Sequence, residues 1–438
     1  MRMSNSVILQ GLIGFMLWCF STRFFSHEWI LLFPVFLLLF QFHKVQFSWV
    51  ALFKKVKFQP VIWIFLIVSC SFLNDVFNGK SYCDWKDWIQ PYWIWPMVIF
   101  SAYAWNGEQI HRGWLIGVFL ESIIAIIERS MGYSSFGQRL DVNDVNLWYN
   151  CRVDGISESS SVLALKLFLS ILMLPFVRIS RKLNLLGMVI LLGGVLVTFN
   201  RSVFIALAVY WCALILVQCR RHGAQWKQWR NLQPILLFCA FFGFVIIINF
   251  WKGENQLNRG GLKEDLTYGN LRAKDSLGLS FDDFPMTCHQ KNAVLLKQGF
   301  ELDTMQWSYQ CLHRLTSGVN TAGRNLIWLN YLQFIEEHPH FGNGSQKLWM
   351  RSVNANKGSV ALMHAHNSLL QFLASHGIWI TLLFLAFYFW LWKRKNAASI
   401  FAIVVYSFFQ FGWGWGFSLL DVMLVYFLIH EAIDENGY

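Results

Sequence analysis

Residues 367–392 read NSLLQFLASHGIWITLLFLAFYFWLW, a run that contains no Asp, Glu, Lys or Arg. An apolar helix of about 20 residues is long enough to cross the hydrocarbon core of a bilayer. Lys393, Arg394 and Lys395 follow the run directly, and such a basic cluster is typical of the cytoplasmic end of a membrane helix. This stretch alone therefore predicts an integral membrane protein.

The composition of the whole chain agrees with this prediction. Of its 438 residues, 55% are hydrophobic and only 14% are charged, whereas soluble proteins carry about 25% charged residues. The net charge of +11 does not indicate nucleic-acid binding, because the basic residues lie in short clusters between apolar stretches. The apolar residues 7–20 lack a small-residue cleavage site before Phe24 and Phe25, which favours a first span over a signal peptide.

The sequence predicts an all-α integral membrane fold of about twelve transmembrane helices. The candidate spans are 7–22, 28–43, 59–74, 87–105, 113–128, 161–177, 184–199, 202–218, 233–251, 367–392, 397–411 and 415–430. Glycines within 412–416 interrupt the last pair, and a re-entrant segment is the alternative there. The chain then divides into a transmembrane part at 1–251, an extramembrane loop at 252–366 and a second transmembrane part at 367–438.

The charges of the connecting loops predict the orientation of the spans. Lysines and arginines concentrate in alternate loops, at Lys44, Lys54, Lys55, Lys57, Arg112, Arg178, Arg181, Lys182, Arg220, Arg221, Lys227, Arg230, Lys393, Arg394 and Lys395. Because basic loops stay in the cytoplasm, we expect both termini to be cytoplasmic. The regions 75–86, 129–160 and 252–366 are then extracytoplasmic.

The large loop at 252–366 is predicted to contain an amphipathic helix. Apolar residues recur there at helical spacing, at Ile327, Trp328, Tyr331, Leu332 and Ile335. Asn320 or Thr321 can cap the start of this helix, and His338-Pro339 ends it. We expect the helix to lie on the membrane surface or to cap the bundle.

Of the nine cysteines, five lie in or beside predicted spans. The other four, Cys83, Cys151, Cys288 and Cys311, all fall in loops predicted to be extracytoplasmic. An oxidising compartment permits disulfides there. A bond between Cys288 and Cys311 would close the large loop, and one between Cys83 and Cys151 would join two shorter loops. Free thiols remain the alternative, because a sequence does not fix the pairing.

Two arginines stand at positions that are unfavourable for a cation. Arg201 lies in the tight connection Asn200-Arg201-Ser202 between two spans, on the predicted outer side. Arg324 opens the amphipathic helix, where its charge opposes the helix dipole and a bound anion would relieve the conflict. A guanidinium is a planar donor fork suited to phosphate. A snorkelling anchor at Arg201 and an ordinary exposed side chain at Arg324 remain the alternatives.

Histidines precede the span at 367–392. His364 and His366 stand just before Asn367, and an imidazole exchanges protons near neutral pH. Such residues are also common as polar groups at a membrane interface. His338 and His340 could join them around a metal ion, but the carboxylates of a metal site are not nearby in sequence, so no metal is predicted.

Three local patterns occur in order along the chain. They are Asn200-Arg201-Ser202, then Gly323-Arg324-Asn325-Leu326-Ile327-Trp328 with HPHFGNG at 338–344, then His366-Asn367 with Gly377. Together they resemble the O-antigen ligase and polymerase family of bacterial membrane glycosyltransferases, over about 190–395 by motif. The twelve-span plan with one large late loop extends the resemblance over the whole chain. Ile380 departs from the ligases, which often have a small residue or Tyr there.

The resemblance implies a GT-C-like bundle in the inner membrane with a periplasmic active site. It implies that a glycan moves from undecaprenyl pyrophosphate to a lipid A–core hydroxyl, with inversion and without a metal, nucleotide sugar or other cofactor. The family's essential arginines correspond to Arg201 and Arg324, and its essential histidine corresponds to His366. His364, Asn367 and His338 are candidates to assist. The implied partners are the lipid-linked donor, the acceptor and membrane lipids.

Two other functions remain open at this point. A repeat-unit polymerase or a pilin oligosaccharyltransferase would share the donor and differ in the acceptor, which would be a glycan or pilin. A polysaccharide transporter or flippase is a different class, favoured by the number of spans. For a transporter, Glu121 and Glu128 are the nearest candidates for buried charges, but no half-repeat is evident.

Overall fold

The computed structural model describes residues 5–24, 59–78, 107–131, 153–157, 159–198, 200–222, 324–344, 365–394 and 397–409, with the single residues Gly243, Leu348, Met423, Leu424 and Phe427. Every regular element in these residues is helical. The helices are α1 (Asn5–Phe20), α4 (Gln59–Phe77), α6 (Gly107–Met131), α8 (Ser160–Met173), the 3-10 turn η1 (Leu174–Phe176), α9 (Arg181–Thr198), α10 (Arg201–His222), α14 (Arg324–Glu337), α16 (Ser368–Arg394) and α17 (Ala397–Phe409). The all-α prediction is confirmed for this part of the chain.

Three of these helices are long and apolar enough to cross a membrane, over Glu108–Met131, Arg181–Thr198 and Ser368–Trp392. Shorter apolar helices cover Val7–Phe20, Trp63–Phe77, Ser160–Phe176, Ser202–Leu216 and Ala398–Phe408. Each of them coincides with a predicted span. The spans predicted at 28–43, 87–105, 233–251 and 415–430 lie largely outside the described residues, so the total of about twelve stays a prediction.

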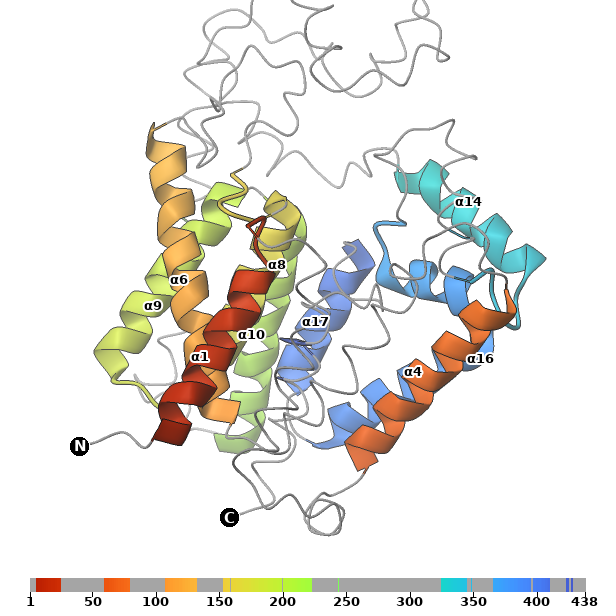
Figure 1. Ribbon diagram of the computed structural model, residues 1–438, viewed down its shortest axis with the longest axis horizontal. Coiled ribbons are helices and arrows are strands. Elements are labelled where there is room, and N and C mark those ends of the chain that lie inside the picture. The colour runs from red at the N-terminus through yellow and green to blue at the C-terminus, as the bar shows by residue number, and fades with distance from the viewer. Residues whose placement is uncertain are drawn as a thin grey trace, which may run out of the picture.

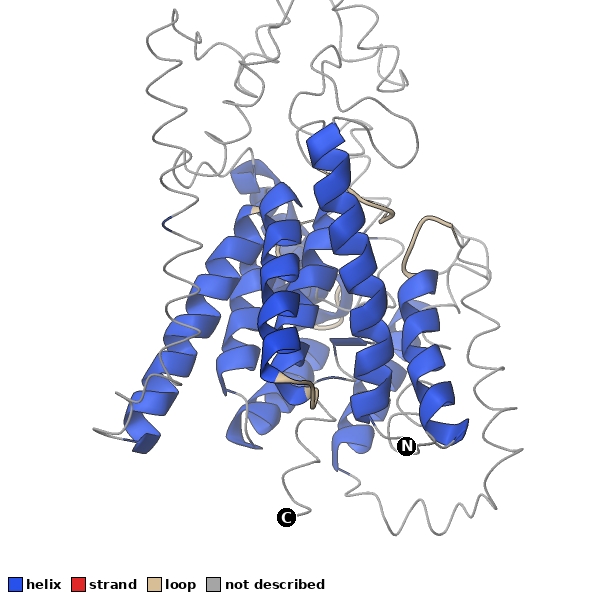
Figure 2. Ribbon diagram, turned by 90° about the vertical axis from the view of Figure 1, so that its left-hand side faces the viewer, coloured by secondary structure: helices blue, strands red, loops and turns tan. Residues whose placement is uncertain are grey.

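The helices form two groups that α17 connects (Figure 1). In one group α6 packs against α1, α8 and α9, while in the other α16 packs against α4 and α14. Helix α17 contacts both α10 and α16. Seen from the side, the long helices stand next to one another (Figure 2).

The contacts at the two ends of the helix bundle come from two different sets of loops. At one end, Arg112 Nη2 donates to Glu108 Oε1 at 2.6 Å and to the carbonyl oxygen of Arg178 at 2.8 Å. At the other end, Arg23 Nη2 lies 2.8 Å from Asp154 Oδ2. Arg112 and Arg178 come from loops predicted to be cytoplasmic, and Arg23 and Asp154 come from loops predicted to be extracytoplasmic. The phase of the predicted crossings therefore agrees with these contacts, while the side that faces the cytoplasm stays a prediction.

A fully buried ion pair joins α6 to α8 in the first group. Lys166 Nζ lies 3.2 Å from Glu121 Oε2, and both side chains have 0% exposure. The Glu121 carboxylate also accepts hydrogen bonds from Trp18 Nε1 and from Ser157 Oγ. Sequence reasoning named Glu121 as a candidate buried charge but missed Lys166 as its partner. Desolvating two charges is costly unless their remaining hydrogen-bonding capacity is used, and here the carboxylate has a second donor on each oxygen.

Candidate active site

The candidate site begins at the N-terminus of α16, which Asn367 caps. Asn367 Oδ1 accepts a hydrogen bond from the Leu370 amide at 3.1 Å, and its carbonyl oxygen accepts from the Gln371 amide at 3.0 Å. A side-chain oxygen at this position satisfies an amide that has no partner inside the helix. Asn367 was predicted as an assisting residue, and the role visible in the structure is that of a helix cap.

His366, immediately before the cap, has a left-handed backbone conformation with φ of 48°. Within the described residues, no other non-glycine residue has a positive φ. This conformation costs free energy for a residue that has a Cβ. Such a residue adopts the conformation only where its surroundings impose it, often at functional sites. The residue is partly exposed and its Nδ1 is buried. The predicted catalytic histidine is therefore partly accessible and lies in a strained turn.

The backbone of Ala365, the residue before His366, is held by side chains from two helices. Trp328 of α14 donates its indole N–H to the Ala365 carbonyl oxygen at 2.9 Å. Gln371 of α16 accepts the Ala365 amide through Oε1 at 3.0 Å. Both polar groups of Ala365 are thus satisfied by side chains, and Ala365 itself is fully buried. Sequence reasoning did not foresee either bond, because neither Trp328 nor Gln371 differs in its local pattern from a core or surface residue.

Helix α14 confirms the amphipathic helix predicted in the large loop. It runs over Arg324–Glu337 and packs on α16 through a small apolar cluster. The cluster consists of Tyr331, Phe334, Leu348, Ala365 and Ala374, with Ile335 and Leu370 against it. Leu332 was expected on the apolar face, but it is 50% exposed because it projects beside that face. Arg324 precedes Trp328 by one turn, about 6 Å along the axis.

The segment that follows α14 packs against a break in α16. At Gly377 the helix is interrupted, with φ of 74° and ψ of −178°. The amides of Asn343 and Gly344 donate to the carbonyl oxygens of Ala374 and Ser375 at 2.9 and 2.8 Å. The Ile378 amide donates to the carbonyl oxygen of Pro339 at 2.8 Å. Backbone groups freed by the break are thus satisfied by the loop, as membrane-buried backbone requires.

Helix α4 contributes polar residues that the sequence analysis did not single out. Asn74 Nδ2 donates to the Ser375 carbonyl oxygen at 3.2 Å, and Asn78 Nδ2 donates to Asn74 Oδ1 at 3.2 Å. Asp75, between them, is only 5% exposed. Their one sequence signal is an Asn-Asp pair at the C-terminal end of an apolar run. The break in α16 is therefore held from two sides, by the loop after α14 and by α4.

Arg201 and Arg324 are the first residues of α10 and α14, and their side chains lie outside the described residues. Asn200 caps α10, since its Oδ1 accepts from the Ser202 amide at 3.1 Å. Helices α9 and α10 meet at the upper end of the bundle in Figure 1, where α14 also lies. His364 and the cysteine pairs Cys288–Cys311 and Cys83–Cys151 fall outside the described residues. The second and third sequence patterns thus contact each other, whereas contact with the first stays a prediction.

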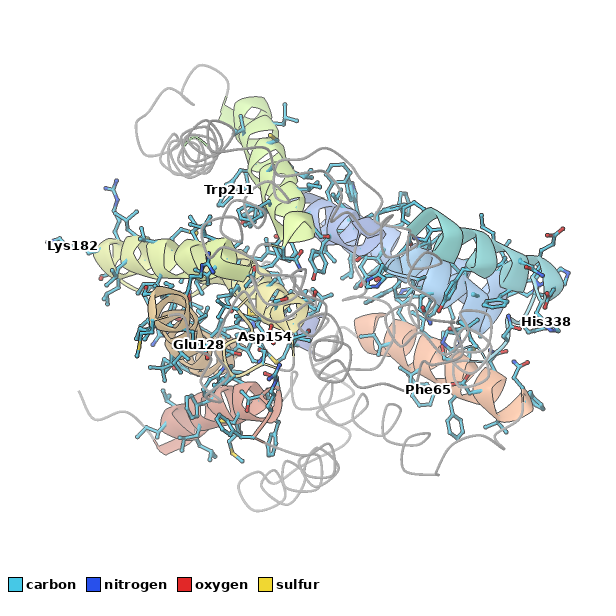
Figure 3. All side chains as sticks on the ribbon, turned by 90° about the horizontal axis from the view of Figure 1, so that it is seen from above. Phe65, Glu128, Asp154, Lys182, Trp211 and His338 are labelled. Atoms are coloured by element: carbon cyan, nitrogen blue, oxygen red, sulfur yellow. The ribbon has the colours of Figure 1, made fainter. Side chains whose placement is uncertain are left out.

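His338 is exposed and ends α14, about 15 Å of helix axis beyond Trp328. Figure 3 labels it at one edge of the molecule, far from Glu128 and Asp154. Its carbonyl oxygen accepts the Gly342 amide at 3.0 Å, which shapes the turn after the helix. Its neighbour His340 stacks on Trp379, with ring centroids 6.2 Å apart. The backbone of His338 thus shapes the loop that holds the break in α16, well away from His366.

A second polar cluster lies in the other helix group, at the end where Arg23 pairs with Asp154. The Gly155 amide donates to Glu128 Oε2 at 3.1 Å, and Asp154 pairs with Arg23. Burial raises the pKa of the Asp154 carboxyl, and the nearby Glu128 charge adds to this, while Arg23 and the Ser160 amide lower it. Among the described residues, no three His, Cys, Asp or Glu side chains gather as metal ligands.

No protein-family model matches the chain, and no curated protein matches it. The resemblance described above therefore rests on the residues of the three patterns and on their arrangement.

Proposed function

We propose that this protein is an O-antigen-ligase-like glycosyltransferase of the bacterial inner membrane. It moves a glycan from undecaprenyl pyrophosphate to a sugar hydroxyl of lipid A–core on the periplasmic face. The observation that carries this proposal is the hydrogen bond from Trp328 to Ala365. It ties the helix that Arg324 opens to the residue before His366, so two separate sequence patterns meet at one turn.

The arginines supply the electrostatic part of the reaction. The leaving group is a lipid pyrophosphate, whose negative charge grows as the glycosidic bond breaks. Guanidinium groups of Arg201 and Arg324 form charge-assisted hydrogen bonds to its oxygens, at helix N-termini whose dipoles also favour an anion. Such donors are most effective where water is partly excluded. A site at the membrane boundary provides this while the lipid tail stays between helices.

His366 supplies the base. Its imidazole takes the proton of the acceptor hydroxyl while that oxygen attacks the anomeric carbon, and the bond from this carbon to the pyrophosphate oxygen breaks. The proton ends on the imidazole and the electron pair ends on the departing pyrophosphate. Because Nδ1 of His366 is buried, Nε2 is the nitrogen we assign to this step. A single direct attack inverts the anomeric centre, and no metal takes part.

The identity of the acceptor distinguishes the proposed ligase function from the alternative functions. Purified protein in proteoliposomes receives an undecaprenyl-pyrophosphate glycan with lipid A–core, with free glycan or with pilin. A new bond to lipid A–core supports the ligase, lengthening of the glycan supports the polymerase, and transfer to pilin supports the oligosaccharyltransferase. Donor movement across the bilayer without a new glycosidic bond supports a transporter.

The same assay tests the assigned base. His366→Ala is expected to lower transfer by about 10²- to 10⁴-fold, the usual contribution of a general base. His340→Ala is the matched control, because His340 is exposed and stacks on Trp379. Normal transfer by His366→Ala would remove His366 from the site.

A further inference from the structure

The backbone of Ala365, just before His366, is held more firmly than a helix start requires. Asn367 already caps α16 through the Leu370 amide, so the helix needs neither Trp328 nor Gln371 to begin. These two side chains instead fix both polar groups of Ala365, one from each of two helices. Ala365 is also buried in the apolar cluster with Tyr331. The restraint therefore acts on the turn that carries His366.

The left-handed conformation of His366 explains why a restraint on this turn is needed. At a φ of 48° the Cβ points in a direction that neither a helical nor an extended residue would give it. Without restraint, a residue with a Cβ leaves this region for a more favourable one. Rotation of the backbone would carry the imidazole away from its present position. A displacement of about 1 Å at a reacting group can cost 10²-fold in rate.

From this geometry we infer that Trp328 and Gln371 are positioning residues, which hold the two backbone polar groups of Ala365 so that the imidazole of His366 meets the acceptor hydroxyl. The inference rests on the proposed function, because it assigns the two residues a task in that reaction. Trp328 also links the base to α14, the helix that Arg324 opens.

Conservative variants separate the hydrogen bonds from the bulk of the side chains. Trp328→Phe keeps an aromatic ring and removes the N–H donor. Gln371→Leu keeps similar size and removes the acceptor, whereas Gln371→Glu keeps an oxygen that can accept the Ala365 amide. Leu332→Ala is the control on α14, because Leu332 lies one turn after Trp328 and is half exposed.

The test measures kcat and KM for glycan transfer from undecaprenyl-pyrophosphate glycan to lipid A–core. Trp328→Phe and Gln371→Leu are expected to lower kcat by roughly 10- to 100-fold with the donor KM unchanged, since they misplace the base. Gln371→Glu and Leu332→Ala are expected to retain the wild-type kcat. Unchanged kcat in both Trp328→Phe and Gln371→Leu would overturn the inference.

Double variants distinguish positioning from general structural damage. If Trp328 and Gln371 act through His366, adding either change to His366→Ala lowers the residual single-turnover rate no further. A further loss in both double variants overturns the inference. If Trp328→Phe does not purify as a folded protein, the comparison of kcat between Gln371→Leu and Gln371→Glu tests the inference by itself. Full activity of His366→Ala is a separate result, which contradicts the proposed function itself.

Discussion

Gly342 and Gly377 lie back to back, so that a methyl group built on Gly342 would come within 2.6 Å of the Gly377 amide nitrogen. It would also overlap the Ser375 carbonyl, and a methyl group on Gly377 would overlap the carbonyl of His340. Both glycines have positive φ, 67° and 74°. This contact joins the loop after α14 to the break in α16, and it explains why both patterns contain a glycine.

Alanine at either glycine is therefore expected to disturb the site. Because both residues have positive φ, Gly342→Ala or Gly377→Ala adds a backbone strain of about 1–3 kcal/mol to the steric overlap. We expect a lower unfolding temperature in detergent and weaker glycan transfer. Gly243→Ala is the matched control, because a methyl group there meets nothing within 4 Å. If both variants matched the Gly243→Ala control in unfolding temperature, the back-to-back packing would be wrong.

The interaction between Glu121 and Lys166 can be measured with a double-mutant cycle. Lys166→Met leaves the Glu121 charge without its cation, and Glu121→Gln leaves the Lys166 ammonium without its anion. Removing one partner of a buried pair typically costs about 3–5 kcal/mol. The double variant removes both charges and is expected to be more stable than either single variant. Additive losses in chemical unfolding would contradict the pairing.

The same double variant bears on the transporter alternative. Under the transferase account, Glu121 and Lys166 join helices and take no part in the reaction, so Glu121→Gln with Lys166→Met should retain transfer when it folds. A transporter that used this intramembrane pair for proton movement would lose its activity. Loss of glycan transfer in a folded double variant would therefore count against the structural role.

The raised pKa of Asp154 predicts that the stability of the folded protein depends on pH. Its folded pKa is raised above the ordinary value of 3.8, chiefly by burial. For such a group the unfolded state releases its proton first, so stability is greatest below the unfolded pKa and is lost as pH rises through the folded pKa. Asp154→Asn stays neutral, so its stability relative to wild type should increase as the pH rises.

Unfolding temperatures measured at several pH values between about 3.5 and 7.5 check this sign. Arg23→Gln is the companion variant, because Arg23 is the cation that lowers the Asp154 pKa. It should enlarge the loss of stability with rising pH. A wild-type protein that gains stability relative to Asp154→Asn as pH rises would contradict the raised pKa.

Arg324→Lys tests the planar contact assigned to the pyrophosphate. Lysine keeps the charge but cannot form a bidentate donor fork. We expect a clear loss of transfer, with unchanged folding and with no rescue by added Mg²⁺. EDTA should leave the wild-type rate unchanged, because we propose that the arginines, not a metal ion, neutralise the charge of the pyrophosphate. Equal turnover by Arg324→Lys would argue against bidentate binding, and loss of activity in EDTA would argue against metal independence.

Much of this fold could be predicted from local pattern. The apolar run before Lys393 identifies the span in α16, and the spacing of Trp328 and Tyr331 identifies α14. Local signals suffice there because helix periodicity and loop charge are carried by neighbouring residues. The same signals placed His366 just before a membrane helix.

The contacts that hold the site could not be predicted in this way. Asn74 and Ser375 are 301 positions apart, and Glu121 and Lys166 are 45 positions apart. The sequence around a single lysine in an apolar run does not identify the residue with which that lysine forms an ion pair. Likewise, nothing in the sequence near His366 indicates that its backbone is left-handed, and Trp328, which binds the neighbouring Ala365 carbonyl oxygen, comes from another helix.

The central claim is that Arg201, Arg324 and His366 form one site around a lipid pyrophosphate. An experimental structure with bound undecaprenyl pyrophosphate tests this most directly. The account predicts guanidinium nitrogens of both arginines within about 3 Å of pyrophosphate oxygens, with His366 facing the position of the anomeric carbon. A pyrophosphate bound away from the starts of α10 and α14, or a His366 turned from it, would contradict the account.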